Sequence, residues 1–258
     1  MHANVPIVID INQKLYCFLM KDAGNSLRES LQHHFQTDLL CHAIKKYTYI
    51  QRAITKQINT FLALGVPDWQ LEKLPMLYEQ LIGQKEIFQE DGMTIDELHI
   101  LHKLSPKFSS MCALLSHHKI PATLDHCDFH DNNILIENNT NNITIIDWGE
   151  TVIAHPFFSM VSCLNNAAYR YALKETDDAY IELQDACLEN WLGFTSQDNL
   201  LEAIFLTKRL WPIYSSLGFY RLMMSSNTKG FKSYADQYFT PLGRLTGFFR
   251  EFIKINTL

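Results

Sequence analysis

The chain has 258 residues, of which 47% are apolar, and its formal net charge is −6. This length can bury one large core or two unequal ones. The acidic balance argues against a nucleic-acid or anionic-membrane surface, because either needs clustered Lys and Arg side chains. No apolar run reaches the length of a membrane span, and the N-terminus is no signal peptide. We expect neither nucleic acid nor membrane as a partner.

The cysteine pattern indicates the compartment. None of the six cysteines has C-x-x-C spacing. Free thiols in a reducing cytosol explain them better than disulfides or zinc ligands do. We therefore expect a cytoplasmic protein.

The N-terminal region has the character of extended chain. Residues 5–11 and 15–20 are apolar, β-branched or aromatic runs separated by residues 12–14, which predicts a β-hairpin. Ser26 can then cap a short helix that runs to His34.

A long helical pattern follows. Apolar residues recur at steps of three and four from Asp38, and Gly65 marks the stop. Thr94 and Glu97 have the spacing of a capping box, and Pro106 is expected to open a further helix.

The second half of the chain changes character twice. Residues 122–147 read as strands, and the chain is helical again after Pro156, with Pro212 and Pro241 as expected kinks or boundaries. The predicted fold class is α+β, dominated by helix.

Two short motifs carry the chemistry. Residues 126–133 read His-Cys-Asp-Phe-His-Asp-Asn-Asn, which matches the kinase catalytic-loop form H-x-D-x-x-x-x-N. The sequence Ile-Ile-Asp-Trp-Gly at residues 145–149 stands where a kinase has its D-F-G motif. Either match alone is weak, so the segment between them decides the interpretation.

That segment has the pattern of a hairpin. Two apolar tetrapeptides, residues 134–137 and 143–146, lie on either side of a five-residue Asn/Thr turn at residues 138–142. Symmetric pairing of Ile134 with Ile146 would place Asn133 opposite Asp147. One neutral and one anionic oxygen ligand side by side suit Mg²⁺. Asp128 would lie close by, where it can accept the proton of a substrate hydroxyl.

The same residues have a rival interpretation as a metal-dependent hydrolase. His126, Asp128, His130 and Asp131 are all possible metal ligands. Such a site needs further histidines, and His155 is the only serious candidate elsewhere in the chain.

Together these features resemble the aminoglycoside phosphotransferase and choline kinase-like group of small-molecule kinases. Residues 18–24 and 26–29 resemble the last strand of the small N-lobe, the hinge and the first C-lobe helix. Residues 64–69 and 74–78 resemble helix connections of the family. The catalytic segment, residues 126–149, and residues 155–158 also match. The resemblance implies a protein kinase-like fold in which residues 1–22 are a remnant of the N-lobe sheet. Residues 23–258 would form a mostly helical C-lobe with an embedded β-hairpin.

The resemblance also implies residue roles, with ATP and Mg²⁺ as cofactors. Asp128 would be the catalytic base that acts on the hydroxyl of a small molecule. Asn133 and Asp147 would bind magnesium, His126 would brace the loop, and His130 would approach the transferred phosphate or pack the loop.

Further roles concern the hinge. The backbone of Met20, Lys21 and Asp22 would contact the adenine. Arg28 and Glu29 would be structural. Acidic residues near and after the catalytic segment, among them Asp131, Glu150, Asp177, Asp178 and Glu182, favour a cationic substrate or are ordinary solvated acids.

The chain departs from the family pattern in three places. Cys127 replaces a common Gly, and Ser159 stands where many members have Asp. Residues 1–20 contain no Gly-rich loop, and Lys14 is in a turn, so the groups that hold the ATP phosphates are not visible. We expect weak or absent ATP turnover unless a missing N-terminal segment or a partner supplies them. The alternative is a catalytically degenerate, kinase-like binding or regulatory module.

Overall fold

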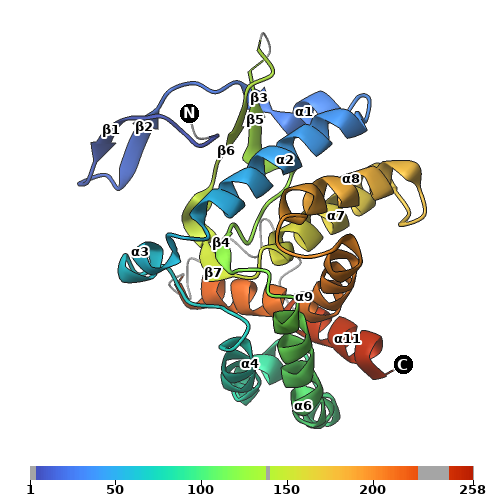
Figure 1. Ribbon diagram of the computed structural model, residues 1–258. Helices are drawn as coiled ribbons and strands as arrows, with labels where there is room; N and C mark the ends of the chain where they lie inside the picture. The colour runs from blue at the N-terminus through green and yellow to red at the C-terminus, as the bar shows by residue number, and fades with distance from the viewer. Residues whose placement is uncertain (1–3, 138–139, 226–243, 258) are drawn as a thin grey trace. The chain divides into compact units, whose positions relative to one another are not determined.

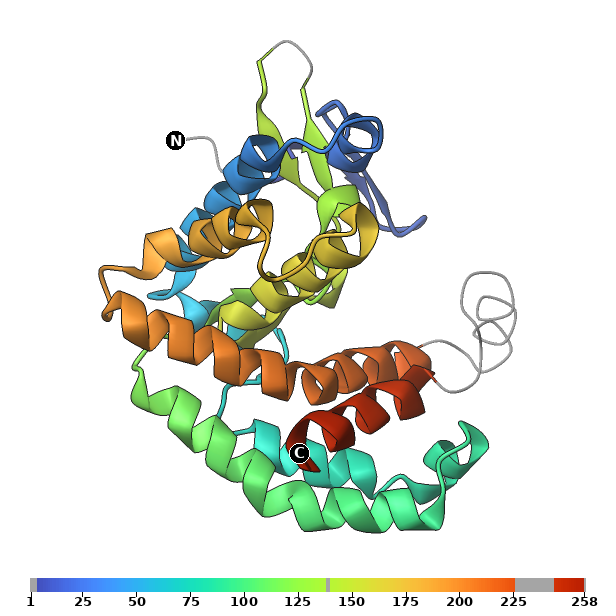
Figure 2. The same cartoon turned by 90° about the vertical axis from the view of Figure 1, so that its right-hand side faces the viewer.

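The computed structural model describes residues 4–137, 140–225 and 244–257 (Figures 1 and 2). The strands are β1 Val8–Asn12, β2 Cys17–Met20, β3 Asn25–Ser26, β4 Thr123–Asp125, β5 Ile134–Ile136, β6 Ile143–Ile145 and β7 Val152–Ala154. The helices are α1 Leu27–Leu31, α2 Thr37–Ile54, α3 Ile58–Ala63, α4 Leu74–Ile82, α5 Lys85–Glu90, α6 Ile95–His117, α7 Phe157–Tyr171, α8 Asp178–Leu188, α9 Gln197–Ser225 and α11 Arg244–Thr257. The α+β class dominated by helix is confirmed.

The chain forms two compact units. The first comprises Met1–Pro67 and Pro121–Gln197, and the second comprises Asp68–Ile120 and Asp198–Leu258. The first unit contains the strands β1 to β7 with α1, α2, α3, α7 and α8, and the second contains α4, α5, α6, α11 and nearly all of α9. Both catalytic motifs lie in the first unit. The boundary at residue 22 stays a prediction.

The N-terminal hairpin is confirmed, with a later turn than expected. β1 and β2 pair antiparallel, and Asn12 pairs with Cys17, so the turn is residues 13–16 rather than 12–14. Figure 1 shows the hairpin extending away from the strands β5 and β6. Its apolar side chains face solvent, since Ile11 is 65% exposed and Phe18 is 58% exposed. Two strands without further sheet partners leave such surface uncovered.

The central hairpin forms with a register different from the symmetric one. β5 and β6 pair antiparallel with Ile134 opposite Ile145, so the predicted pairing of Ile134 with Ile146 is wrong by one residue. The backbone N–H of Ile146 donates to the carbonyl of Asn133 at 2.9 Å. Asn133 therefore lies opposite Ile146, and Asp147 comes one residue later. β3 extends this sheet by pairing with β5.

A second small sheet positions the start of the catalytic loop. β4 pairs antiparallel with β7, a strand that the sequence pattern did not indicate. All three residues of each strand are buried, and α2 packs against β4. Because β4 ends at Asp125, the sheet fixes the point where the catalytic loop begins.

The expected helices of the first unit are present with changed ends. Ser26 caps α1 by accepting a hydrogen bond from the Arg28 N–H, but α1 ends at Leu31 rather than His34. The long pattern from Asp38 divides into α2 and α3, with the break at residues 55–57. The break contains neither Gly nor Pro, so the apolar spacing alone did not reveal it.

In the second unit, the capping box of α6 is confirmed and two predictions are wrong. Thr94 accepts from the Glu97 N–H, and Glu97 accepts from the Thr94 N–H. Pro106 does not open a helix but lies inside α6, whose buried face continues on both sides of it. Residues 74–78 are not a connection, because they form most of α4, where Pro75 fits the first turn.

The core of the second unit is aromatic. Tyr78 stacks on Phe108 with ring centroids 4.8 Å apart, and Phe249 and Phe252 of α11 complete the cluster. Figure 2 shows α11 alongside α9, and Arg209 of α9 donates to Asn256 of α11.

Beyond residue 156, helices dominate as expected. Pro212 is buried inside α9 and does not end it, whereas Pro241 lies outside the described residues. Within the part of the chain that the structure describes, no helix is both long and apolar enough to cross a lipid bilayer.

Candidate active site

The catalytic loop follows β4 and leads through a single 3-10 turn, Asp131–Asn133, into β5. The backbone N–H of His126 donates to the hydroxyl of Tyr47 at 2.9 Å and to that of Ser159 at 3.0 Å. The His126 Nε2 lies 2.8 Å from the carbonyl oxygen of Ile146. The loop is thus tied to α2, α7 and the end of β6 through one residue.

His126 is fully buried, and burial lowers the pKa of its imidazole, so the neutral form is favoured. A neutral imidazole donates a hydrogen bond from one nitrogen only. Donation from Nε2 to Ile146 suits this form, and Nδ1 has no hydrogen-bond partner among the described residues. This geometry fits the bracing role that the resemblance implies.

A buried carboxylate below the loop was missed by the sequence analysis. Asp125 is fully buried and accepts hydrogen bonds from the backbone N–H groups of Cys127 at 3.1 Å and Ser159 at 2.9 Å. Cys127 has φ of 64°, the left-handed region that favours glycine, which explains why its position commonly holds Gly. The sequence offers one signal for Asp125, an acidic residue directly before the H-x-D-x-x-x-x-N motif.

The carboxylate of Asp128 is held from two sides. Its Oδ1 lies 3.3 Å from the Nε2 of His130, and its Oδ2 accepts from the Nδ2 of Asn133 at 2.9 Å. The His130 Nδ1 accepts from the Asn132 N–H, which leaves the proton on Nε2. Burial raises the pKa of the Asp128 carboxyl, but the contacts with His130 and Asn133 lower it more. The net pKa lies below the ordinary Asp value.

Asn133 and Asp147 are neighbours despite the changed register. The amide nitrogen of Asn133 is engaged by Asp128, whereas its Oδ1 makes no hydrogen bond with a described residue. Asp147 is exposed, and its carboxylate likewise has no hydrogen-bond partner in the described part of the chain. Its backbone is left-handed, with φ of 64° and ψ of 53°, which ends the strand pleat there. Two available oxygen ligands one ladder position apart suit Mg²⁺.

Asp131 belongs to a buried ion cluster. It is 3% exposed, and its Oδ1 lies 2.9 Å from Nε and 2.8 Å from a terminal nitrogen of Arg28. Its Oδ2 accepts from the Tyr171 hydroxyl, and Arg170 is 3.9 Å away. The pairing of Arg28 with Asp131 is consistent with the structural role expected for Arg28. The negative charge of Asp131 is already balanced by Arg28, so Asp131 is not one of the acidic residues that could attract a cationic substrate.

The hydrolase interpretation finds no assembled site in the described residues. Within residues 4–137, 140–225 and 244–257, no group of three or more His, Cys, Asp or Glu is arranged to hold a metal ion. His155 is buried; its Nδ1 accepts from the Phe157 N–H at 3.3 Å, and its ring contacts that of Phe157. All six cysteines are free thiols.

Two of the three expected hinge residues, Met20 and Lys21, pair with the first strand of the N-terminal hairpin or the residue before it. Met20 pairs with Val8, and the Lys21 N–H donates to the Ile7 carbonyl at 2.9 Å. The Lys21 N–H is therefore not available to adenine in this structure. Asp22 accepts from the Gly24 N–H at 3.0 Å, which turns the chain toward β3.

A helix-anchored loop followed by the hairpin β5–β6 defines the chain as protein kinase-like in fold. Residues 21–193 match the phosphotransferase enzyme family, and the chain belongs to that family. A comparison with curated protein sequences finds no match.

Solved structures with this fold include small-molecule kinases. The ethanolamine kinase of Plasmodium vivax matches with a TM-score of 0.61 and 12% identity, over 99% of this chain and 68% of that one. An aminoglycoside phosphotransferase of Streptomyces rimosus, solved with ADP and streptomycin, matches with a TM-score of 0.46 and 12% identity, over 80% of this chain and 75% of that one.

Proposed function

We propose that the protein is an ATP- and Mg²⁺-dependent phosphotransferase that acts on a hydroxyl group of a small molecule. The observation that carries the proposal is the Asp128 carboxylate, kept ionised between His130 and Asn133 beside two available oxygen ligands. An ionised carboxylate can accept a hydroxyl proton, and a side chain that is 46% exposed can be reached by substrate.

The proposed reaction is an in-line transfer. The substrate hydroxyl oxygen forms a bond to the γ-phosphorus, the bond from that phosphorus to the β,γ-bridging oxygen breaks, and ADP leaves. The hydroxyl proton passes to Asp128. Asn133 and Asp147 would hold Mg²⁺, which neutralises charge on the phosphate oxygens when bound. His130 and Asn133 orient Asp128, and His126 holds the loop in place.

The substrate class is a finer proposal. The solved relatives are named for ethanolamine and for aminoglycosides, which are hydroxylated amines. We propose a hydroxylated amine for this chain as well, with ATP as the phosphoryl donor. We also propose a cytoplasmic location, since six free thiols suit a reducing compartment.

A second candidate function is a binding or regulatory module without turnover. It is favoured by the exposed hairpin β1–β2, where the side chains of Ile9, Ile11, Phe18 and Leu19 are each 58–65% exposed. In the kinase fold, phosphates are held by groups on the small lobe. A hairpin without further sheet partners offers few such groups.

The test is phosphoryl transfer by the purified chain. ATP, MgCl₂ and a panel of hydroxylated amines are supplied, and ADP formation is measured with and without EDTA. The Asp128→Asn variant should lose roughly 10²–10⁴-fold in rate, as expected for a lost general base. Asp198→Asn, at an exposed position of α9, is the matched control and should keep full activity.

Binding measurements separate the two candidates. Magnesium-dependent ATP binding without turnover would favour the binding module. Turnover that survives Asp128→Asn unchanged would refute the site assignment, and the absence of both binding and turnover would refute both functions.

A further inference from the structure

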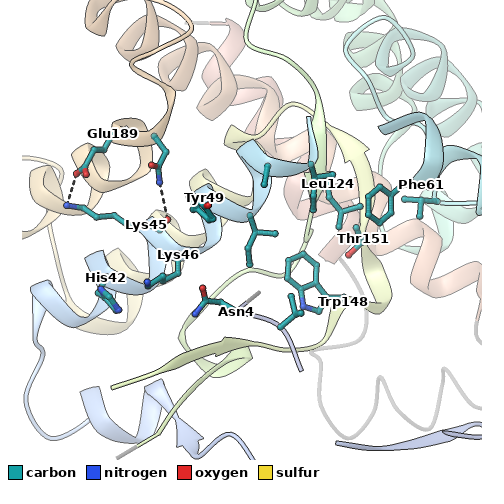
Figure 3. Close-up of a pocket in the computed structure, with 16 residues that line it drawn as sticks. Asn4, His42, Lys45, Lys46, Tyr49, Phe61, Leu124, Trp148, Thr151 and Glu189 are labelled. Atoms are coloured by element: carbon teal, nitrogen blue, oxygen red, sulfur yellow. Dashed lines mark hydrogen bonds and ion pairs between the residues drawn. The ribbon is translucent and has the colours of Figure 1, made fainter. Parts of the chain in front are cut away.

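The first unit contains a cavity of about 1110 Å³ that the proposed phosphotransferase site does not use (Figure 3). It lies along one face of α2 and is bordered by α3 and by the turn after β6. Asp128, His130, Asn133 and Asp147 are not among its lining residues. Its volume is slightly above the range of about 300–1,000 Å³ for small-molecule sites.

One end of the cavity is apolar. Phe61 and Leu124 line it from α3 and β4, and Trp148 lines it from the turn after β6. Ile54 and Val66 extend the same wall. Figure 3 shows Phe61, Leu124 and Trp148 together at this end. An apolar ligand portion would lose contact with water here, which is favourable in proportion to the area buried.

The other end is polar and carries one uncompensated positive charge. His42, Lys45 and Lys46 stand on one turn of α2, and Figure 3 shows them together with Asn4 on the side away from Phe61. Lys45 is paired with Glu189, with 2.6 Å between Nζ and Oε2. Lys46 has no ion pair with a described residue.

His42 does not add to this charge. Burial is the first cause that lowers the pKa of its imidazole, and the neighbouring charges of Lys46 and Lys45 lower it further. At neutral pH the imidazole is therefore uncharged. The ligand that fits this end carries a single negative group for Lys46.

We propose that the cavity binds a small amphiphile with one carboxylate and an unbranched apolar tail. The carboxylate pairs with Lys46, and the tail extends along Ile50 and Ile54 toward Trp148. A cationic amphiphile would be repelled by the Lys46 ammonium group, and a neutral amphiphile would leave that charge without a partner.

The cavity is connected to the metal-binding hairpin through Trp148. This residue directly follows Asp147, its indole N–H donates to the Ile145 carbonyl at 2.8 Å, and its ring centroid lies 4.9 Å from that of His126. A tail packed against the indole therefore touches the turn that carries Asp147. Ligand binding should change the environment of Trp148, which gives an optical signal without any enzyme assay.

The test titrates the full chain with decanoate, below its micelle concentration, and follows tryptophan fluorescence and heat. We expect saturable one-to-one binding and loss of the fluorescence change in Trp148→Phe. Octanoate should bind about an order of magnitude more weakly, because each methylene contributes roughly fourfold. Decyltrimethylammonium, with a tail one methylene longer and the opposite charge, should bind at least about tenfold more weakly.

Two variants locate the ligand. Lys46→Met should weaken decanoate binding about tenfold, whereas Lys103→Met, at an exposed position of α6, should not change it. Ala53→Phe adds a ring to the cavity wall and should abolish binding while circular dichroism and the melting temperature stay unchanged. The proposal is overturned by non-saturable binding, by equal affinity for decyltrimethylammonium, or by a normal affinity in Ala53→Phe. None of these readouts depends on phosphoryl transfer, so the outcome is independent of the proposed function.

Discussion

His130 and Asp128 face each other across the catalytic loop, with 3.3 Å between Nε2 of the imidazole and Oδ1 of the carboxylate. This contact and the Asn133 amide together lower the pKa of Asp128 against the effect of burial. His130 therefore lowers the pKa of Asp128, the proposed catalytic base, whether or not its side chain also approaches a phosphate.

The first prediction concerns this pair. In His130→Ala the pKa of Asp128 should rise, because burial then acts against the Asn133 contact and the weaker influence of His126 only. The carboxyl ¹³C shift of Asp128 followed against pH measures it. His34→Ala, at an exposed position, should leave that titration unchanged. An unchanged pKa in His130→Ala would mean that the contact with His130 does not lower the pKa of Asp128.

The second prediction concerns the ion cluster at Asp131. Arg28→Met leaves a carboxylate that is 3% exposed without its main partner, whereas Asp131→Asn leaves an arginine that is 25% exposed and can reach water. Removing one partner of a buried pair costs about 3–5 kcal/mol. We expect Arg28→Met near that range and Asp131→Asn lower, measured by urea unfolding. Equal losses would contradict the role of burial.

The third prediction compares two glycines with nearly the same positive φ angle. Gly24 has φ of +95° and Gly65 has φ of +90°. A methyl group at Gly24 would lie 2.0 Å from the carbonyl oxygen of Ile136, whereas one at Gly65 meets nothing within 4 Å.

Gly24→Ala should therefore cost more stability than Gly65→Ala, by at least about 2 kcal/mol, because it adds a clash to the shared backbone strain. Unfolding of the two variants side by side isolates the clash. Similar losses would mean that β3 can move away from β5 at little cost.

The fourth prediction is a pH dependence in the second unit. Hydrogen bonds from Arg250, and then from Thr94, lower the pKa of Glu97 to about 2. Because the folded pKa is below the unfolded value of about 4.3, this contribution is present above the unfolded value and is lost as pH falls toward 2. The Arg250 side chain is 50% exposed, so we expect only about 1 kcal/mol.

Thermal unfolding between pH 6 and pH 2 tests this expectation. In Glu97→Gln, the melting temperature plotted against pH should fall less steeply below pH 4.5. Asp96→Asn, its exposed neighbour in the same first helical turn, is the control and should leave that part of the curve in place.

Much of the local structure could be predicted because it depends on neighbours in the chain. The capping box of Thr94 and Glu97, the cap at Ser26 and the strands of the central hairpin each follow from residues a few positions apart. The spacing of His126, Asp128 and Asn133 likewise indicates a kinase-like loop from the sequence alone.

Long-range pairing decided the rest. The hairpin register differs by one residue because the turn closes with the Glu137 N–H donating to the Asn142 carbonyl at 3.0 Å, and apolar spacing does not encode where a turn closes. Pro106 remains within α6, since the helix has buried residues before and after it.

The partners of the catalytic loop come from distant parts of the chain. Tyr47 of α2 lies 79 positions from His126, and Arg28 lies 103 positions from Asp131. The sequence by itself determined which residues are chemically suited to the site. Only the tertiary structure decided which of them are free for ligands, because burial and pairing with distant side chains set the charge and the availability of each group.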